Sequence, residues 1–189
     1  MVTAATDVTR AFLFSMAANQ CAVFGPGDPD AVLATIVERA REHTADGTAV
    51  ALSLGDPTLD DLGVAPALLA AGLTLLRPDD PEWFSGLVVA GVGVTTSIAA
   101  VAATGNVALS AGVGLPRATS LLPPAHVCIV RASQVYATFP EAITGLLHAG
   151  PLPSALTWIG GPSRTGDLEM RTTFGVHGPK VVDIVLLQD

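Results

Sequence analysis

The chain has 189 residues, of which half are hydrophobic and 14% are charged, and its formal net charge is −8. This composition excludes a disordered chain, and the acidic balance leaves no basic surface for nucleic acid. We expect a cytoplasmic protein with one domain over residues 1–189, in which residues 1–19 form an N-terminal helical arm.

The first half of the chain alternates between helical and strand patterns. Asp28 is suited to cap a helix whose first position is Pro29. Val32, Ile36 and Ala40 then recur at helical spacing, while apolar runs that end in glycine or proline indicate strands. In order, these patterns predict a helix at 7–18, a strand at 21–24, a helix at 29–43, a strand at 48–54, a helix at 59–71 and a strand at 73–76.

The second half opens with a long uncharged run between Trp83 and Pro116, which is long enough to cross a bilayer. Gly, Thr, Ser and Asn interrupt it repeatedly, so we interpret it as a buried strand, helix and strand and expect no membrane span. In order, this half predicts a strand at 87–94, a helix at 95–104, strands at 106–110, 126–131 and 134–138, a helix at 140–148, and strands at 155–159 and 181–187.

The alternation of strands and helices indicates the α/β class. Parallel strands that are joined by crossing helices are buried on both faces, which suits the continuous apolar runs of this sequence. The sequence therefore predicts a three-layer α/β/α domain with a mostly parallel sheet.

Cys21 and Cys128 lie in apolar runs about a hundred residues apart. Neither has a second cysteine or a histidine at the spacing of a metal site, so we expect buried free thiols. The chain has no motif for an iron–sulfur cluster and we expect no metal site. If the protein takes part in redox chemistry, another subunit carries the electrons.

A dense group of polar residues follows the strand at 155–159. Gly-Gly-Pro at 160–162 specifies a turn. Ser163 or Thr165 is expected to cap a short helical turn that attracts an anion, and Arg164 to hold a carboxylate or phosphate. The alternative is a surface turn in which Arg164 pairs with Asp167 or Glu169.

This region carries a resemblance to a known family. GPSRTGDLE at 161–169 and GVHGP at 175–179 are similar to the C-terminal signature of the LUD (lactate utilisation, DUF162) family, in particular of its LutC-like members. The resemblance continues in the segments 103–105, 116–126 and 129–134. Because several spaced motifs occur in the right order, the chain is identified as a member of this family.

The resemblance implies an architecture like that of the NagB/RpiA/CoA-transferase proteins and a LutC-like role in oxidising L-lactate to pyruvate. It implies iron–sulfur partner subunits that carry the clusters, and it is compatible with a homo-oligomer. The chain itself would serve assembly or bind a small anion through Ser163, Arg164 and Thr165, with Arg117 as a further contact.

A second candidate cluster combines a turn with polar residues further along the chain: Thr104, Gly105, Arg117, Ser120 and His126. Arg117 is held either near an anion or in a structural ion pair with a carboxylate such as Asp167 or Glu169. His126 opens an apolar strand, which favours a core histidine bonded to backbone over a catalytic base.

The sequence departs from the family beside the Thr-Gly pair. Relatives usually have a glutamate before this pair and a threonine after it, whereas this chain has Ala103 and Asn106. An acid or base role of that glutamate is therefore missing at this position. A diverged binding protein that keeps the scaffold is one alternative function.

The other alternative is an enzyme that acts by itself on a small anionic or phosphorylated metabolite. Its candidate acids and bases are Asp167, Glu169 and His177. Ser163 with His177 and Asp167 has the composition of a hydrolase triad without a nucleophile elbow.

One further motif, Gly91-Val-Gly93 followed by two threonines, begins like a dinucleotide fingerprint. It lacks the third glycine and the later acidic residue, so a tight strand–helix turn is favoured over NAD binding.

Overall fold

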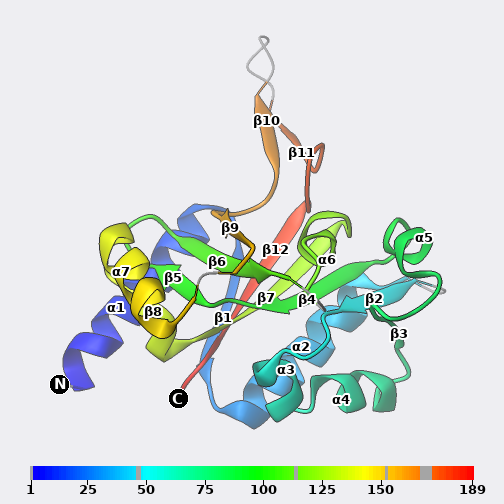
Figure 1. The fold of residues 1–189 in the computed structure, drawn as a ribbon, viewed down its shortest axis with the longest axis horizontal. Coiled ribbons are helices and arrows are strands. Elements are labelled where there is room, and N and C mark those ends of the chain that lie inside the picture. The colour runs from blue at the N-terminus through cyan, green and yellow to red at the C-terminus, as the bar shows by residue number, and fades with distance from the viewer. Residues whose placement is uncertain (1, 46–47, 113–114, 152, 167–171) are drawn as a thin grey trace.

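The structure is a computed structural model, and it describes residues 2–45, 48–112, 115–151, 153–166 and 172–189. Its centre is a parallel sheet, which we call the main sheet (Figure 1). All five pairs of neighbouring strands in it are parallel. Across the sheet the strands are β1 (Ala22–Gly27), β12 (Val181–Leu187), β7 (Ala125–Arg131), β4 (Val92–Thr96), β2 (Ala49–Leu52) and β3 (Thr74–Leu76).

A second sheet of four short strands lies against the main sheet, and we call it the small sheet. One of its strands, β6, pairs antiparallel with both of its neighbours, β5 and β9, whereas β5 and β8 pair in parallel. In order it contains β8 (Val135–Tyr136), β5 (Ala99–Val101), β6 (Asn106–Ala111) and β9 (Ala155–Ile159).

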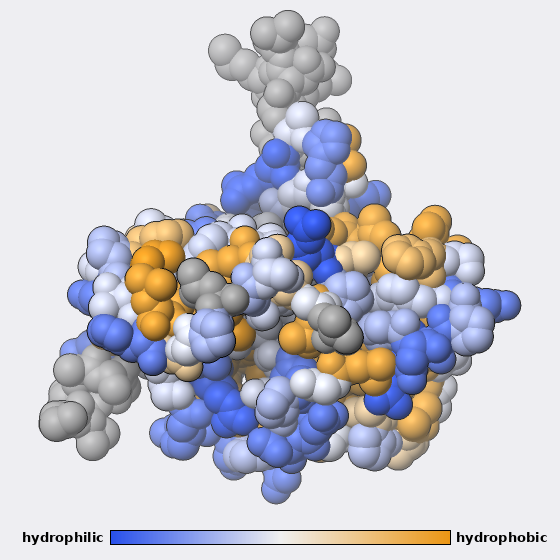
Figure 2. Space-filling model, in the orientation of Figure 1, coloured by the Kyte–Doolittle hydropathy of each residue, from blue (hydrophilic) through white to orange (hydrophobic). Residues whose placement is uncertain are grey.

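A two-stranded hairpin of β10 (Arg164–Gly166) and β11 (Thr172–Phe174) forms a third unit, the arm. It projects from the body of the molecule in Figure 1, and Figure 2 shows the same projection in the space-filling view. The helices are α1 (Val2–Ala18), α2 (Pro29–His43), α3 (Pro57–Asp61), α4 (Val64–Ala70), α5 (Trp83–Leu87), α6 (Ala118–Leu121), the 3-10 turn η1 (Ala132–Gln134) and α7 (Phe139–Ala149).

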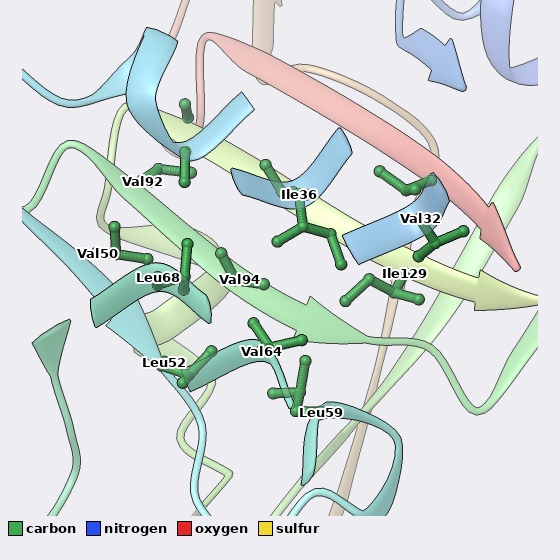
Figure 3. Packing of buried hydrophobic residues seen from close by; sticks show 14 of the residues in the cluster. Val32, Ile36, Val50, Leu52, Leu59, Val64, Leu68, Val92, Val94 and Ile129 are labelled. Atoms are coloured by element: carbon green, nitrogen blue, oxygen red, sulfur yellow. The ribbon is translucent and has the colours of Figure 1, made fainter. Parts of the chain in front are cut away.

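Helices α2, α3 and α4 cover one face of the main sheet. Val32 and Ile36 of α2 lie in one cluster with Val94 and Ile129 of the sheet, and all four are buried (Figure 3). The helix starts where the sequence predicts, because the Asp28 carboxylate accepts a hydrogen bond from the Ala31 N–H. Burial of each such aliphatic side chain contributes about 1.5–3 kcal/mol.

The opposite face of the main sheet is covered by α1 and the small sheet. Phe12 and Met16 of α1 pack in one cluster with Val107 of β6 and with Val130 and Ile184 of the main sheet. Helix α7 then packs through Ala142 and Leu146 on the outer face of the small sheet. The predicted α/β class with a mostly parallel sheet is confirmed, and the structure adds a sheet to the layer on this face.

The helix predicted over 95–104 is wrong. Residues 92–96 are strand β4, and after two residues the chain enters strand β5, which hairpins into β6. Ala99 and Val101 pack toward α7 while Ala100 packs toward the main sheet, so both faces of β5 are buried. A short apolar run covered on both sides has no polar face, and its periodicity cannot separate a strand from a buried helix.

The strand predicted over 87–94 starts later, because α5 ends at Leu87 and β4 begins at Val92. The Gly91–Gly93 motif is likewise not a strand–helix turn. Gly93 lies within β4, where a Cβ atom would come 1.8 Å from the Thr119 carbonyl oxygen of α6. The glycine is needed for the close approach of this helix to the strand.

The single helix predicted over 59–71 is two short helices, α3 and α4. Gly63 separates them with φ +65°, a left-handed conformation that glycine adopts at little cost. Among the described residues, no helix is both long enough and apolar enough to cross a membrane.

Candidate functional site

A cavity of about 280 Å³ lies where strands β2 and β4 of the main sheet end, and we call it the edge cavity. The carboxyl edge of parallel strands is the usual ligand position in open α/β sheets. The lining is rich in hydroxyl groups: Ser53, Asp56, Pro57, Thr58, Thr95, Thr96, Ser97, Ile98, Leu109, Ser110, Leu115, Pro116, Arg117, Ser120, Gln134 and Thr157.

Asp56 positions one wall of the edge cavity. Its Oδ1 accepts hydrogen bonds from the backbone N–H of Thr58 at 3.0 Å and of Leu59 at 3.3 Å, which caps α3. Its Oδ2 accepts a hydrogen bond from the Thr96 hydroxyl. Both oxygens are thus engaged, and this carboxylate orients the cavity wall. The signal was present in the sequence, since Asp56-Pro57 repeats the Asp28-Pro29 pattern at the start of α2.

Arg117 supplies the positive charge of the edge cavity. It immediately precedes α6, its side chain is exposed, and it forms no ion pair with a carboxylate of the described residues. Asp167 and Glu169, its expected alternative partners, lie outside the described residues. Ser120 is buried on the same helix and donates its hydroxyl to the Arg117 carbonyl oxygen at 3.1 Å.

A second cavity of about 320 Å³ lies at the base of the arm, and we call it the arm-base cavity. Ser120 and Thr157 line both cavities, so the two are neighbours. The full lining is Ser120, Leu121, His126, Thr157, Trp158, Ile159, Gly160, Gly161, Ser163, Arg164, His177, Gly178 and Pro179.

Ser163 joins the two ends of the arm at this cavity. Its N–H donates to the Pro179 carbonyl at 2.9 Å, and its own carbonyl accepts from Gly175 N–H at 2.9 Å. Its Oγ accepts from the His177 backbone N–H at 3.2 Å. Ser163 and His177 therefore lie together, and their contact runs through the His177 backbone N–H. The carboxylates proposed as partners of His177, Asp167 and Glu169, belong to the part of the chain that is not described.

The helical turn expected to start at Ser163 or Thr165 is wrong, because residues 164–166 form strand β10. Thr165 pairs with Thr173 of β11 in the arm and lines neither cavity. Arg164 is exposed, and its Nη2 donates to the Asn19 carbonyl at 3.0 Å. Because this carbonyl follows the last turn of α1, a cation is favourably placed there.

Thr104 and Gly105 form the turn between β5 and β6 and line neither cavity. Their carbonyl oxygens each accept a hydrogen bond from Asn19 Nδ2 at 2.9 Å. Asn19 thus ties this turn to the Arg164 side chain. Sequence reasoning missed Asn19, which carries no signal beyond its place after an apolar helix. Ala103 and Asn106 flank the turn and lie outside both cavities.

His126 is the buried side chain that connects the cavities. Its imidazole is fully buried on β7, and its Nε2 lies 2.8 Å from the Thr95 Oγ1, which lines the edge cavity. Among the described residues, none forms a hydrogen bond with Nδ1. Burial lowers the pKa of His126 to about 4, against a weaker opposing effect of Asp183, so the ring is neutral near pH 7. The core histidine expected here is present, but its partner is a hydroxyl instead of backbone.

Cys21 and Cys128 are buried free thiols, as predicted. Burial raises the pKa of each to about 12, so neither is a ready nucleophile or metal ligand in the folded chain. Within the described ranges, His, Cys, Asp and Glu side chains form no group of three that could hold a metal ion.

Comparison with known proteins places these features in a family. The family model described as LUD domain matches residues 10–187. Lactate utilization protein C of Deinococcus radiodurans is 31% identical over 143 residues, which cover 74% of this chain and 67% of the relative. The protein of the same name from Shouchella clausii is 30% identical over 159 residues, which cover 81% of this chain and 69% of the relative.

A solved structure supports the fold independently. The crystal structure of a DUF162 family protein from Deinococcus radiodurans matches with a TM-score of 0.64 and 21% identity, and it covers 97% of this chain and 98% of that one. At this identity the match shows the fold alone, while the family rests on the sequence matches. The resemblance found in the motifs is thus confirmed, and the chain belongs to the LUD domain family.

Proposed function

We propose that this protein is a LutC-like component of an L-lactate utilisation system, in which lactate is oxidised to pyruvate. The observation that carries the proposal is the similarity to two proteins named Lactate utilization protein C over 74% and 81% of this chain. In this role the chain binds a small anion or partner subunits in the cytoplasm and carries no redox centre itself. The clusters that accept the electrons belong to iron–sulfur partner subunits.

The chemistry of the edge cavity supports anion binding. Arg117 contributes a guanidinium that is paired with no described carboxylate, and Thr95, Ser97 and Ser120 contribute hydroxyl groups. A guanidinium next to hydroxyl donors suits a small carboxylate or phosphate. Asp56, the carboxylate in this cavity, accepts three hydrogen bonds from neutral groups and keeps its negative charge, so the anion is expected beside Arg117 and away from Asp56.

The proposal is tested by deleting the gene in the source organism and measuring growth on L-lactate and on glucose as sole carbon sources. The expected result is loss of growth on lactate alone, restored by the wild-type gene and poorly restored by Arg117→Ala. Arg10→Ala is the matched control, because Arg10 is an exposed arginine on α1 that pairs with Asp7, far along the chain from the edge cavity. Undiminished growth of the deletion strain on lactate would contradict the proposal.

A pull-down of the tagged protein under low oxygen tests the partners separately. Iron analysis and lactate-dependent dye reduction are measured on the same eluate. Iron–sulfur subunits that oxidise lactate are expected to co-purify. An iron-free eluate without this activity would instead favour a protein that acts alone.

A further inference from the structure

Helix α5 is apolar on its outer side as well as on its inner side. Trp83 and Leu87 lie one turn apart and are buried in a cluster with Ala51 of β2. Phe84 and Val88 are also one turn apart, and they are 77% and 76% exposed. A surface helix usually carries polar residues on its outer side, and a helix that is hydrophobic all round is usually buried. The outer side of α5 therefore has the composition of a covered surface.

Helix α6 extends this apolar surface. Ala118 of α6 packs against the buried cluster beneath α5, so the two helices are neighbours (Figure 1). Val89, after α5, and Leu122, after α6, are also exposed. We call the four exposed side chains Phe84, Val88, Val89 and Leu122 the α5–α6 face. Single exposed apolar residues are ordinary, but a group of neighbouring ones marks an interaction surface.

The charges beside the α5–α6 face differ between its two ends. Asp79 and Glu82 precede α5 and are exposed, and the exposed Arg117 precedes α6. Gly93 follows α5 and lies so close to α6 that a Cβ atom on it would come 1.8 Å from the Thr119 carbonyl oxygen. Helix α6 therefore lies toward the C-terminal end of α5. The N-terminal end of α5 is thus acidic, and Arg117 makes the other end basic.

These charges remain available for a partner. Within the described part of the chain, neither Asp79 nor Glu82 forms an ion pair, and the same holds for Arg117. A surface that is apolar in the middle, acidic at one end and basic at the other is complementary to itself when one copy is turned end for end. The surface therefore matches a second copy of the same chain.

From this arrangement we infer that the α5–α6 face binds a second copy of the chain around a twofold axis that crosses α5. The two α5 helices then run antiparallel, with Phe84 of one copy against Val88 of the other, and this contact forms twice. The acidic end of each α5 meets Arg117 of the other copy. Because Arg117 also lines the edge cavity, the second copy lies beside that cavity. The inference goes beyond the proposed function and does not depend on it.

Two electrostatic effects bear on the choice of partner. The net charge of −8 on each copy opposes association, but physiological salt screens most of this repulsion beyond about 8 Å. The local pairs between the acidic and basic ends act over shorter distances. A membrane surface suits the face less well, because Asp79 and Glu82 repel anionic lipids.

The test is sedimentation equilibrium of the purified full-length protein between about 1 μM and about 100 μM. The wild type is expected to have the mass of two chains at the upper end and to dissociate on dilution. Phe84→Asp, which places a carboxylate in the apolar centre, is expected to raise the dissociation constant at least about thirtyfold. Because Phe84 is exposed in the single chain, this variant is expected to fold, and circular dichroism checks it.

The matched control is Phe14→Asp. Phe14 is 76% exposed, but it lies on α1 outside the α5–α6 face, so this variant is expected to associate like the wild type. A wild-type protein with the mass of one chain at every concentration would overturn the inference, and the face would then serve a different protein or a membrane. An equal loss of association in both variants would also overturn it.

A charge reversal tests the antiparallel arrangement. Arg117→Glu places like charges together at both ends of the interface and is expected to weaken the dimer about fivefold. Adding Glu82→Arg to this variant is expected to restore most of the affinity, because the opposite charges face each other again. A double variant no tighter than Arg117→Glu alone would overturn the arrangement. These measurements are made without lactate, so their failure leaves the proposed function standing, and normal growth of the deletion strain on lactate leaves the dimer standing.

Discussion

Two ionisable side chains, Asp183 and His126, are fully buried on neighbouring strands of the main sheet, and they differ in the partners that stabilise them. Asp183 of β12 faces α2, where its Oδ2 accepts from Arg39 Nε at 2.7 Å and lies 2.7 Å from His43 Nε2. His126 of β7 faces the opposite side and has a single hydroxyl partner. Asp183 is compensated by opposite charge, whereas His126 is kept uncharged.

Each side chain also keeps one atom that no described residue hydrogen-bonds, Oδ1 of Asp183 and Nδ1 of His126. Asp183 lines neither cavity, so its unpaired oxygen is a cost of folding, whereas His126 stands in a cavity wall. The difference teaches that a buried carboxylate requires opposite charge beside it, whereas a buried imidazole requires only that it stay neutral. The following predictions test the two sides of this comparison.

The largest expected effect on stability comes from the ion pair of Asp183 with Arg39. Arg39→Ala leaves Asp183 buried without its guanidinium, and we expect a loss of about 3–5 kcal/mol in the free energy of unfolding. Burial by itself would lower the pKa of Arg39, but the hydrogen bond and charge of Asp183 raise it, in agreement with a tight pair. Urea denaturation at pH 7 measures the change.

The control for this variant is Arg10→Ala, which removes an exposed pair with Asp7 and should change stability by less than about 1 kcal/mol. Equal, small losses for both variants would show that the buried Asp183 side chain does not need Arg39 for the stability of the fold.

The next effect is the pH dependence of stability that comes from the neutral His126. His126 has a folded-state pKa of about 4, below its ordinary value of 6.5. Protonation therefore favours the unfolded chain, so the contribution of this residue is fully present above pH 6.5 and is lost as the pH falls toward 4. The loss amounts to about 3 kcal/mol. Urea denaturation between pH 7 and pH 4 measures it, and His126→Asn, which does not titrate there, should lose correspondingly less.

A smaller effect is expected from Thr95→Val, which keeps the shape of the side chain but removes the partner of His126 Nε2. Leaving this nitrogen unpaired should cost about 1–3 kcal/mol. Thr35→Val is the matched control, since the Thr35 hydroxyl donates to the Ala31 carbonyl of its own helix. Thermal denaturation of both variants measures the difference. An unchanged melting temperature for Thr95→Val would mean that the hydrogen bond between Thr95 and His126 does not stabilise the fold.

The smallest effect on stability is expected from Arg164→Ala. This exposed side chain interacts with the end of α1 through Asn19, and such a contact is worth about 0.3–1 kcal/mol. Urea denaturation should therefore barely distinguish this variant from the wild type. A loss of several kcal/mol would show that Arg164 serves the fold more than a ligand.

The parts of the fold that could be predicted from the sequence are those with a complete local signal. Helix α2 has its cap at Asp28, proline at its first position and an apolar face, and strands β7 and β12 are unbroken apolar runs. The segment 95–104 could not be predicted, because small apolar residues buried on both faces fit a strand and a helix equally well.

The candidate sites were predicted only in part, because a site depends on which loops the sheet brings together. Two predicted site residues line the edge cavity, Arg117 and Ser120. Three others line the arm-base cavity, Ser163, Arg164 and His177, so the predicted residues are divided between two cavities. Asp56 is not among the site residues that the sequence predicts. The unpaired nitrogen of His126 could not be inferred at all, since it depends on which side chains pack around β7 in the fold.

The most direct test of the account is the pH titration of the His126 ring nitrogens by NMR in the folded protein. The account predicts a neutral ring from pH 7 down to about pH 5. A ring that titrates near pH 6.5 would contradict the comparison with Asp183.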